Sequence, residues 1–355
     1  MNLLVNIKKT IKSFTLTANF ETDESVLSVL GESGAGKSLL LKCIAGIETP
    51  DSGKIVLGER ILFDSEKRIN LPPQKRNVGY LFQNYALFPN MTVGQNIKVT
   101  AKNPDSVSKY LNQFGLAEKE NCFPSFLSGG EQQRVALARL LASDPEVFLF
   151  DEPFSALDNH RKAELEKLIL DMLEEKNLPA ILVTHDRNEA FRLSDKITSM
   201  EKGKLSRPEE KHIFFENPKS LAAARLTGCK NASRIQIENE KIFALDWGIP
   251  LSFEKETCQK TCVSYAAFRA HYFMPANSPK KANTFSCDIK RIIEDTFSFI
   301  IYFTQKGNPL NTKDSLLCWE VTKEQWKEIE PRAKSGTLYA RLDMSKLMLF
   351  EGETE

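Results

Sequence analysis

The sequence predicts an α/β domain built on a mixed, largely parallel sheet, followed by a smaller all-β domain. Within the first 205 residues, apolar strand-length runs alternate with helical patterns, as expected for βαβ units. After about residue 205, short β-rich segments are separated by turn residues such as Gly307-Asn308-Pro309. The length of 355 residues exceeds what one ordinary hydrophobic core organises, so two domains are expected.

Three strand-length apolar runs define the expected parallel strands of the first domain. They are Ser25 to Leu30 (SVLSVL), Val147 to Phe150 (VFLF) and Ala180 to Thr184 (AILVT). A half-buried strand is expected over residues 14–20, where apolar and polar side chains alternate. Helices are expected to begin near Lys37 and to cover residues 131–142, 159–176 and 188–193.

The second domain is expected to be a small β-barrel or sandwich. A short helix over residues 214–225 connects it to the first domain, and the boundary is placed at about residue 230, which gives domains 1–230 and 231–355. The expected strands cover residues 234–237, 261–266, 284–293, 297–304, 316–321 and 337–342.

The composition narrows the classes of function. The chain has 48 Lys+Arg against 47 Asp+Glu, a net charge of +1, so it carries no electrostatic footprint for nucleic acid or an anionic membrane surface. No apolar run approaches the roughly 18 residues that span a bilayer, and the N-terminus lacks the apolar core of a secretory signal. We therefore expect a cytoplasmic protein. The 7 Cys are scattered, as for reduced thiols, and Cys258 and Cys262 lack the second Cys/His pair of a zinc site.

A glycine-rich segment after the first apolar run matches the pattern G-x-x-x-x-G-K-[ST]. Its glycines let backbone N–H groups point at phosphate oxygens, and the following helix N-terminus adds positive potential. Lys37 can reach the β- and γ-phosphates, and the Ser38 hydroxyl can hold Mg²⁺. The alternative is a chance glycine-rich turn, but the motif follows a strand and opens a helix, as nucleotide binding requires. The residues expected to bind nucleotide are Gly31, Glu32, Ser33, Gly34, Ala35, Gly36, Lys37 and Ser38.

Two carboxylates, Asp151 and Glu152, directly follow the run VFLF. Because this buried strand is expected to end at the sheet edge that faces the phosphates, Asp151 is suited to bind Mg²⁺ and Glu152 to polarise an attacking water. The alternative is that either carboxylate only caps the next turn. His185 follows the run AILVT at the same edge, where it is either a structural histidine or a contact to the γ-phosphate.

The segment Leu127 to Arg134 (LSGGEQQR) resembles the signature of the ATP-binding cassette (ABC) ATPases. A hydroxyl and unhindered N–H groups lie here at the expected N-terminus of a helix, supplied by Ser128, Gly129 and Gly130. This helix N-terminus is a second potential phosphate-binding site in the chain. In this family a head-to-tail dimer brings the signature of one copy over the phosphate loop of the other. A plain helix-capping loop is the alternative for this segment alone, but the order phosphate loop, glutamine, signature, acidic strand and histidine is complete.

The resemblance covers residues 1 to about 230 and implies further roles. Gln83 looks like the glutamine that contacts Mg²⁺ and the attacking water, and Asp158 (in SALD) looks like a dimer-interface residue. Glu152 looks like the general base and His185 like the switch histidine. A set of side chains near Gln83 would either receive a membrane subunit or pack in the core: Tyr85, Leu87, Phe88 and Pro89.

Two positions depart from the family pattern. No aromatic residue precedes Phe14 at the place where many members stack a side chain on adenine, and Phe14 itself is assigned to the following strand. Glu32 stands where proline is common, and its carboxylate is expected to point outward because it would repel phosphates. The sequence therefore predicts phosphate recognition and leaves adenine recognition open.

Within the family, residues 71–97 and 214–233 resemble the molybdate and tungstate importer ATPases. Residues 283–350 resemble the small OB-like domains called TOBE or MOP (molybdate-binding) domains, which bind oxyanions, regulate transport or serve a structural, dimerising role. The resemblance implies an ATPase that uses ATP and Mg²⁺ at the cytoplasmic face of the membrane to energise molybdate uptake.

The partners implied are a second copy of the chain, integral-membrane permease subunits and, indirectly, an extracytoplasmic binding protein, with no nucleic acid. Tungstate, sulfate, another anion, iron or an organic cation are alternative cargoes. A soluble ABC ATPase without a membrane partner is a further alternative, but that class usually has a coiled-coil insertion or two cassettes, and this sequence has neither.

Overall fold

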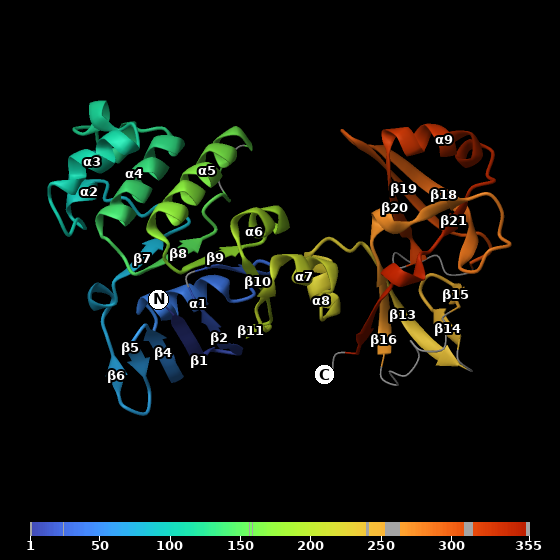
Figure 1. Ribbon diagram of the computed structural model, residues 1–355, viewed down its shortest axis with the longest axis horizontal. Coiled ribbons are helices and arrows are strands. Elements are labelled where there is room, and N and C mark those ends of the chain that lie inside the picture. The colour runs from blue at the N-terminus through green and yellow to red at the C-terminus, as the bar shows by residue number, and fades with distance from the viewer. Residues whose placement is uncertain are drawn as a thin grey trace. The chain divides into compact units, whose positions relative to one another are not determined.

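The computed structural model describes residues 2–23, 25–155, 157, 159–238, 241–252, 263–308 and 315–352. The chain divides into two compact units, Met1–Phe214 and Phe215–Glu355 (Figure 1). The functional boundary after residue 230 stays a prediction. Asp158, Cys258 and Cys262 lie outside the described residues.

The first unit is organised by one mixed sheet. Its strands are β1 (Leu3–Ile11), β2 (Phe14–Thr22), β3 (Val26–Leu30), β4 (Ser52–Leu57), β5 (Arg60–Asp64), β6 (Ile69–Asn70), β7 (Val78–Leu81), β8 (Val147–Asp151), β9 (Ala180–Thr184), β10 (Lys196–Glu201), β11 (Lys204–Leu205) and β12 (Glu209–Glu210). In the described residues the order of the 12-stranded sheet is β6-β5-β4-β1-β2-β11-β10-β3-β9-β8-β7, with β12 on β10. Strands β10, β3, β9, β8 and β7 pair with one another in parallel, whereas β6, β5, β4, β1 and β2 pair with one another antiparallel. Between these two groups, β11 is parallel to β2 and antiparallel to β10, and β12 is antiparallel to β10. The predicted mixed, largely parallel sheet is confirmed.

Helices cover this sheet, and three of them form a separate helical part. Figure 1 shows α2, α3 and α4 together beyond the strand ends, and α4 packs against both of the others. The helices of this unit are α1 (Lys37–Ala45), α2 (Val93–Lys98), α3 (Ser106–Gln113), α4 (Gly129–Ala142), α5 (Asn159–Lys176) and α6 (Arg187–Leu193), with short 3-10 turns at Pro73–Lys75, Ala117–Lys119 and Pro124–Phe126.

Strand β8 is apolar up to its last residue, Asp151, because both of its faces are covered. Val147 and Leu149 pack into the core that contains the residues of α1, whereas Phe148 and Phe150 pack into the core that contains those of α4 and α5. A continuous apolar run is the pattern expected of a strand between two helical layers. The carboxylates that follow this run are therefore carried on a rigid strand end.

In the described residues of the second unit, two five-stranded antiparallel sheets surround one core. The first has the order β15-β14-β13-β16-β22 and the second β17-β21-β18-β19-β20. Trp247, Phe268, Phe303 and Trp319 are buried in the shared core. The strands are β13 (Asn231–Glu238), β14 (Lys241–Ala244), β15 (Ile249–Leu251), β16 (Val263–Phe268), β17 (Met274–Ala276), β18 (Thr284–Glu294), β19 (Ser298–Gln305), β20 (Leu317–Thr322), β21 (Tyr339–Arg341) and β22 (Met348–Glu351), with 3-10 turns at Ala270–Tyr272 and Met344–Lys346.

Two helical details differ from the sequence prediction. The helix expected over residues 214–225 is two short helices, α7 (Lys211–Glu216) and α8 (Leu221–Leu226). Pro218 lies between them and cannot donate to a continuing helix, while the Ser220 hydroxyl accepts from the N–H of Ala223 at 3.0 Å and begins α8. The β-rich unit also contains an unpredicted helix, α9 (Lys323–Lys334), which a capping box between Thr322 and Gln325 begins.

Candidate active site

The glycine-rich loop joins β3 to α1 and has the backbone that its glycines permit. Gly34 has φ 81° and Gly36 has φ 107°, both in the left-handed region. A Cβ atom at Gly36 would stand 2.7 Å from Cζ of Phe14, so the ring of Phe14 lies directly against the loop. The side chain of Glu32 is exposed. The loop thus presents bare backbone at the start of α1, with an aromatic ring beside it.

Lys37 curls back over this loop. Its Nζ atom donates to the carbonyl oxygens of Gly31 and Glu32, each at 2.9 Å, and lies 3.4 Å from Oε1 of Glu152. The side chain is only 4% exposed, so a buried cation is held between the loop and the acidic strand end. An anion at the loop would meet this cation and the N-terminus of α1 together.

Asp151 at the end of β8 is paired with the first turn of α1. Its Oδ1 atom accepts from the Ser38 hydroxyl at 2.7 Å, and its Oδ2 atom accepts from the Tyr80 hydroxyl at 2.8 Å. Burial raises the pKa of Tyr80, and the neighbouring carboxylate of Asp151 raises it further, so Tyr80 stays a neutral donor. Sequence analysis did not anticipate this contact with Tyr80, which comes from the adjacent strand β7.

Ser38 and Asp151 fit the requirements of a small divalent cation. Their oxygen atoms are hard ligands, and they stand together beside the loop where phosphates are expected. Among the described residues no group of three or more His, Cys, Asp or Glu side chains gathers to hold a metal. Mg²⁺ in proteins usually keeps several water ligands and takes others from bound phosphates, so one or two protein oxygen atoms are enough to hold it.

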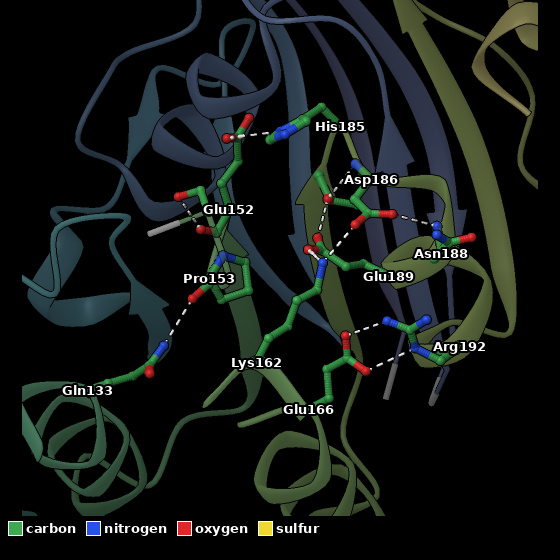
Figure 2. Close-up of polar contacts among 12 residues, drawn as sticks. Gln133, Glu152, Pro153, Lys162, Glu166, His185, Asp186, Asn188, Glu189 and Arg192 are labelled. Atoms are coloured by element: carbon green, nitrogen blue, oxygen red, sulfur yellow. Dashed lines mark hydrogen bonds and ion pairs between the residues drawn. The ribbon is translucent and has the colours of Figure 1, made fainter. Parts of the chain in front are cut away.

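Glu152 lies between two basic side chains. Its Oε2 atom is 3.3 Å from Nδ1 of His185, while Oε1 faces Lys37, and Figure 2 shows the contact with His185. The backbone of Glu152 has φ 45°, an uncommon conformation for a non-glycine residue, and its N–H donates to the carbonyl of Val183 at 3.1 Å. This backbone turn directs the carboxylate towards the loop. The side chain of His185 is 58% exposed, so it can meet a ligand.

Gln83 reaches the same strand end through a serine. Its Nε2 atom donates to the Ser155 hydroxyl at 3.2 Å, and that hydroxyl donates to the carbonyl of Glu152 at 3.0 Å. The structure therefore brings Gln83 beside Glu152. Asp158, which follows in the chain, lies outside the described residues.

The signature segment begins α4 with a closed set of hydrogen bonds. Ser128 is the N-cap: its N–H and hydroxyl both donate to Oε2 of Glu131, at 2.7 and 2.9 Å, and its oxygen accepts from the N–H of Glu131. The Ser128 N–H, followed by the hydroxyl, holds the pKa of Glu131 below its ordinary value. In the part of the chain that the structure describes, no hydrogen bond or ion pair joins Ser128, Gly129 or Gly130 to the phosphate loop.

Gln133, which sequence analysis passed over, links the signature helix to the acidic strand end. It is 2% exposed, and its Nε2 atom donates to the carbonyl of Pro153 at 3.0 Å, as Figure 2 shows. The sequence signal was a polar residue on the otherwise apolar, buried face of an amphipathic helix. Because Pro153 follows Glu152 directly, this hydrogen bond fixes the end of β8 relative to α4.

The segment after Gln83 separates into buried and exposed residues. Tyr85 is 8% exposed and packs in the core, whereas Phe88 is 42% exposed and Pro89 is also exposed. Leu87 packs partly against the same core as Tyr85. Core packing thus accounts for Tyr85 and Leu87, and the exposed pair is left as candidate docking surface.

The fold and this arrangement are similar to those of ABC-type ATP-binding domains. Residues 15–155 match the family model described as ABC transporter. Among solved structures, the chain is similar to a dimeric ATP-binding cassette in a post-hydrolysis state bound to ADP and Pi, with a TM-score of 0.50 and 26% identity; the match covers 59% of this chain and 99% of that one.

Two curated relatives carry different cargo names. The chain is 42% identical over 206 residues to a molybdenum import ATP-binding protein, ModC, of Haemophilus ducreyi, covering 57% of this chain and 59% of the relative. It is 41% identical over 211 residues to an Fe(3+) ions import ATP-binding protein, FbpC, of Haemophilus influenzae, covering 57% of this chain and 60% of the relative. The similarity spans about three fifths of these relatives' length.

Proposed function

We propose that this chain binds ATP with Mg²⁺ and hydrolyses it as the ATP-binding subunit of an ABC importer. The observation that carries the proposal is one continuous set of contacts at the strand ends. Ser38 meets Asp151 at 2.7 Å, Lys37 meets Glu152 at 3.4 Å, and Glu152 meets His185 at 3.3 Å. A phosphate-binding cation, a cation-binding pair, a carboxylate base and a histidine are thereby adjacent.

The chemistry follows from the position of each group. Lys37 and the loop N–H groups would bind the β- and γ-phosphates. Ser38, Asp151 and Gln83 would hold Mg²⁺, which, bound with the nucleotide, neutralises charge on the phosphates. Glu152 would take the proton of the attacking water, and His185 would contact the γ-phosphate.

Phe14 is our candidate for the adenine platform. Its ring lies against Gly36 and is only partly buried. Stacking on an aromatic face recognises a base without requiring hydrogen bonds, so the absence of an earlier aromatic residue in the sequence is compensated by the first residue of β2.

The signature points to a second copy as partner. We expect Ser128, Gly129 and Gly130 of one copy to meet the phosphates bound by the other, with Asp158 at the interface. The similar solved structure is itself a dimeric cassette. Because Glu131 already accepts from Ser128, a phosphate there would share or displace that carboxylate.

The cargo proposal is molybdate. It is supported by the relative named for molybdenum import, and the relative named for Fe(3+) import keeps iron as the alternative. We further propose that the chain works at the cytoplasmic face of the membrane, where a permease contacts the exposed Phe88 and Pro89. In the described residues no helix is both long and apolar enough to cross a bilayer. The second unit would regulate transport or pair copies.

Steady-state ATP turnover by the purified full chain tests the enzymatic proposal. We expect Glu152→Gln to lower kcat by about 10²-fold or more while ATP binding is retained, because only the proton acceptor is lost. Lys37→Ala should lose ATP affinity as well. A wild-type chain that does not hydrolyse ATP, or a Glu152→Gln variant as active as wild type, contradicts the proposal.

Cell composition tests the cargo. Molybdenum and iron contents are compared in cells with and without the gene, with limiting molybdate or limiting iron in the medium. A fall in molybdenum alone supports molybdate, whereas a fall in iron alone replaces it with the alternative.

A further inference from the structure

We infer that Lys162 is a positioning residue for His185, so that the geometry of the histidine depends on helix α5. The inference rests on the proposed function of His185 and adds to it a residue that no motif contains. Figure 2 shows the arrangement: Lys162 extends from α5 to the start of α6, next to the end of β9 that carries His185.

Lys162 makes two close ion pairs. Its Nζ atom lies 2.6 Å from Oδ2 of Asp186 and 2.6 Å from Oε1 of Glu189. The side chains are 19%, 29% and 7% exposed respectively, so these pairs are screened less than surface pairs. Lys162 therefore holds both carboxylates in one place.

The two residues that flank His185 are fixed through this cluster. The hydroxyl of Thr184 donates to Oε2 of Glu189. The same hydroxyl oxygen, Oγ1, accepts from the N–H of Asp186 at 3.0 Å. Asp186 also caps α6, because its Oδ1 atom accepts from the N–H of Asn188 at 2.8 Å. His185 itself is more than half exposed and makes the contact with Glu152, so its position is set mainly by these neighbours.

Loss of the Lys162 cation would leave two carboxylates facing each other. Burial alone raises the pKa of Asp186, but the hydrogen bonds from Lys162 and from the Asn188 N–H outweigh it and hold the pKa below its ordinary value. Without Lys162 the carboxylates of Asp186 and Glu189 would repel, and Asp186 would move. Because Asp186 is bonded to His185, the imidazole would move away from Glu152.

A second ion pair between the same two helices provides the matched control. Arg192 of α6 donates to both oxygens of Glu166 of α5, at 2.9 and 2.6 Å, and Figure 2 shows this pair beyond the Lys162 cluster. Glu166 is 11% exposed, comparable with Glu189. Breaking this pair disturbs α5–α6 packing but removes no hydrogen bond of Thr184 or Asp186.

The test compares Lys162→Met, Lys162→Arg and Arg192→Met in the full chain by steady-state ATP turnover. We expect Lys162→Met to lower kcat about 10- to 100-fold with KM for ATP and ATP affinity within about twofold, because a displaced group costs rate and not binding. Lys162→Arg should restore most of kcat, and Arg192→Met should stay within about threefold of wild type.

A double-mutant cycle with His185→Ala separates positioning from stability. If Lys162 acts through His185, adding Lys162→Met to His185→Ala lowers kcat no further. The inference is overturned if the two losses add in full, or if Lys162→Met and Arg192→Met lower kcat equally. Should Lys162→Met fail to fold, Lys162→Met with Glu189→Gln leaves fewer unpaired carboxylates and is read by the same criteria. A wild-type chain without ATP turnover would instead reject the proposed function itself.

Discussion

Glu152 and His185 face each other across 3.3 Å, from the ends of the adjacent parallel strands β8 and β9. Parallel strands that end at one edge bring residues far apart in sequence to the same place, which is why two separate apolar runs each precede a functional candidate. The pair also places Glu152 between two basic groups, since Lys37 lies on its other side.

Replacement of His185 by Ala should reduce turnover without loss of nucleotide. We expect kcat to fall about 10²-fold, as for loss of a group that orients the reacting atoms, and ATP affinity to change little because Lys37 and the loop remain. Equilibrium ATP binding and steady-state turnover are measured on the same preparation. A His185→Ala enzyme with wild-type kcat would leave His185 a structural residue.

Replacement of Phe14 by Ala should weaken nucleotide binding. Base stacking on an aromatic ring contributes about 1–3 kcal/mol, so ATP affinity should fall by about 5- to 150-fold. Phe14→Tyr keeps the ring and should bind as wild type. Inorganic triphosphate provides the control ligand, because its affinity should not change; equal losses for triphosphate and ATP would assign Phe14 to loop packing.

Arg76 should be among the most sensitive structural residues of the first unit. Its side chain is 0% exposed, and its guanidinium donates to the carbonyls of Cys43 and Ile44 at the end of α1 and to that of Leu71. Arg76→Met removes these donors, and the Cys43 carbonyl keeps only the N–H of Gly46, so the free energy of unfolding should fall by about 3 kcal/mol.

Urea unfolding followed by circular dichroism checks this value. The 3 Trp all lie in the second unit, so their fluorescence does not follow the first. Lys109→Met is the control, since the exposed pair of Lys109 with Glu175 at 3.9 Å should contribute less than about 0.5 kcal/mol. Equal effects of the two substitutions would contradict the assignment of Arg76.

Arg139 should restrain the turn that follows Gln83. Its guanidinium donates to the carbonyls of Tyr85 and Ala86 at 2.7 and 2.8 Å and stacks over Phe88, while Tyr85 and Ala86 have φ 59° and 43°. Because these left-handed residues are strained, Arg139→Met should raise amide hydrogen exchange across residues 83–92 by about tenfold. Arg134→Met on the same helix is the control. Unchanged amide hydrogen exchange in Arg139→Met would show that the turn does not depend on Arg139.

The Lys162–Asp186 pair should give stability a defined pH window. The pKa of Asp186 is lowered in the folded protein, so its contribution is complete above about pH 4 and is lost as pH falls through the folded value. Burial lowers the pKa of Lys162, but hydrogen bonds to Asp186 and Glu189 raise it overall, so this contribution is complete below about pH 10 and is lost above. Urea unfolding measured from pH 3 to 11 should show that the free energy of unfolding falls at both the acid and the alkaline end. In Lys162→Met the fall at the alkaline end should be absent. If the free energy of unfolding of that variant falls at alkaline pH as in wild type, the fall belongs to other titratable groups.

Local sequence patterns were sufficient to predict the strands on either side of the glycine-rich loop and the helix that follows it. The loop residues from Gly31 to Ser38 are contiguous, and their chemistry depends on backbone that glycines alone permit. The run VFLF is apolar because helices cover both faces of β8, so the same pattern predicted the strand and the position of Asp151 and Glu152.

Local sequence patterns could not predict contacts between segments that are distant in the chain. Gln133 and Lys162 look like ordinary polar residues of amphipathic helices, and their partners Pro153 and Asp186 are chosen by the packing of α4, α5 and α6. Helix α9 was not predicted for a different reason. The residues before it are β-rich, so the whole segment was assigned to strands and turns, although the capping box at Thr322 is present in the sequence.

The two cores that share β8 restrict where the first unit can bend. One layer of β8 side chains is locked to α1 and the other to the helical part, and Gln133 adds a buried hydrogen bond to Pro153. A rotation of α2–α4 about the strand would break the close packing around Phe148 and Phe150 together with the Gln133 hydrogen bond. The exposed hydrogen bond between Gln83 and Ser155 is easier to open than these buried contacts, so a hinge at Gln83 costs less than one at β8.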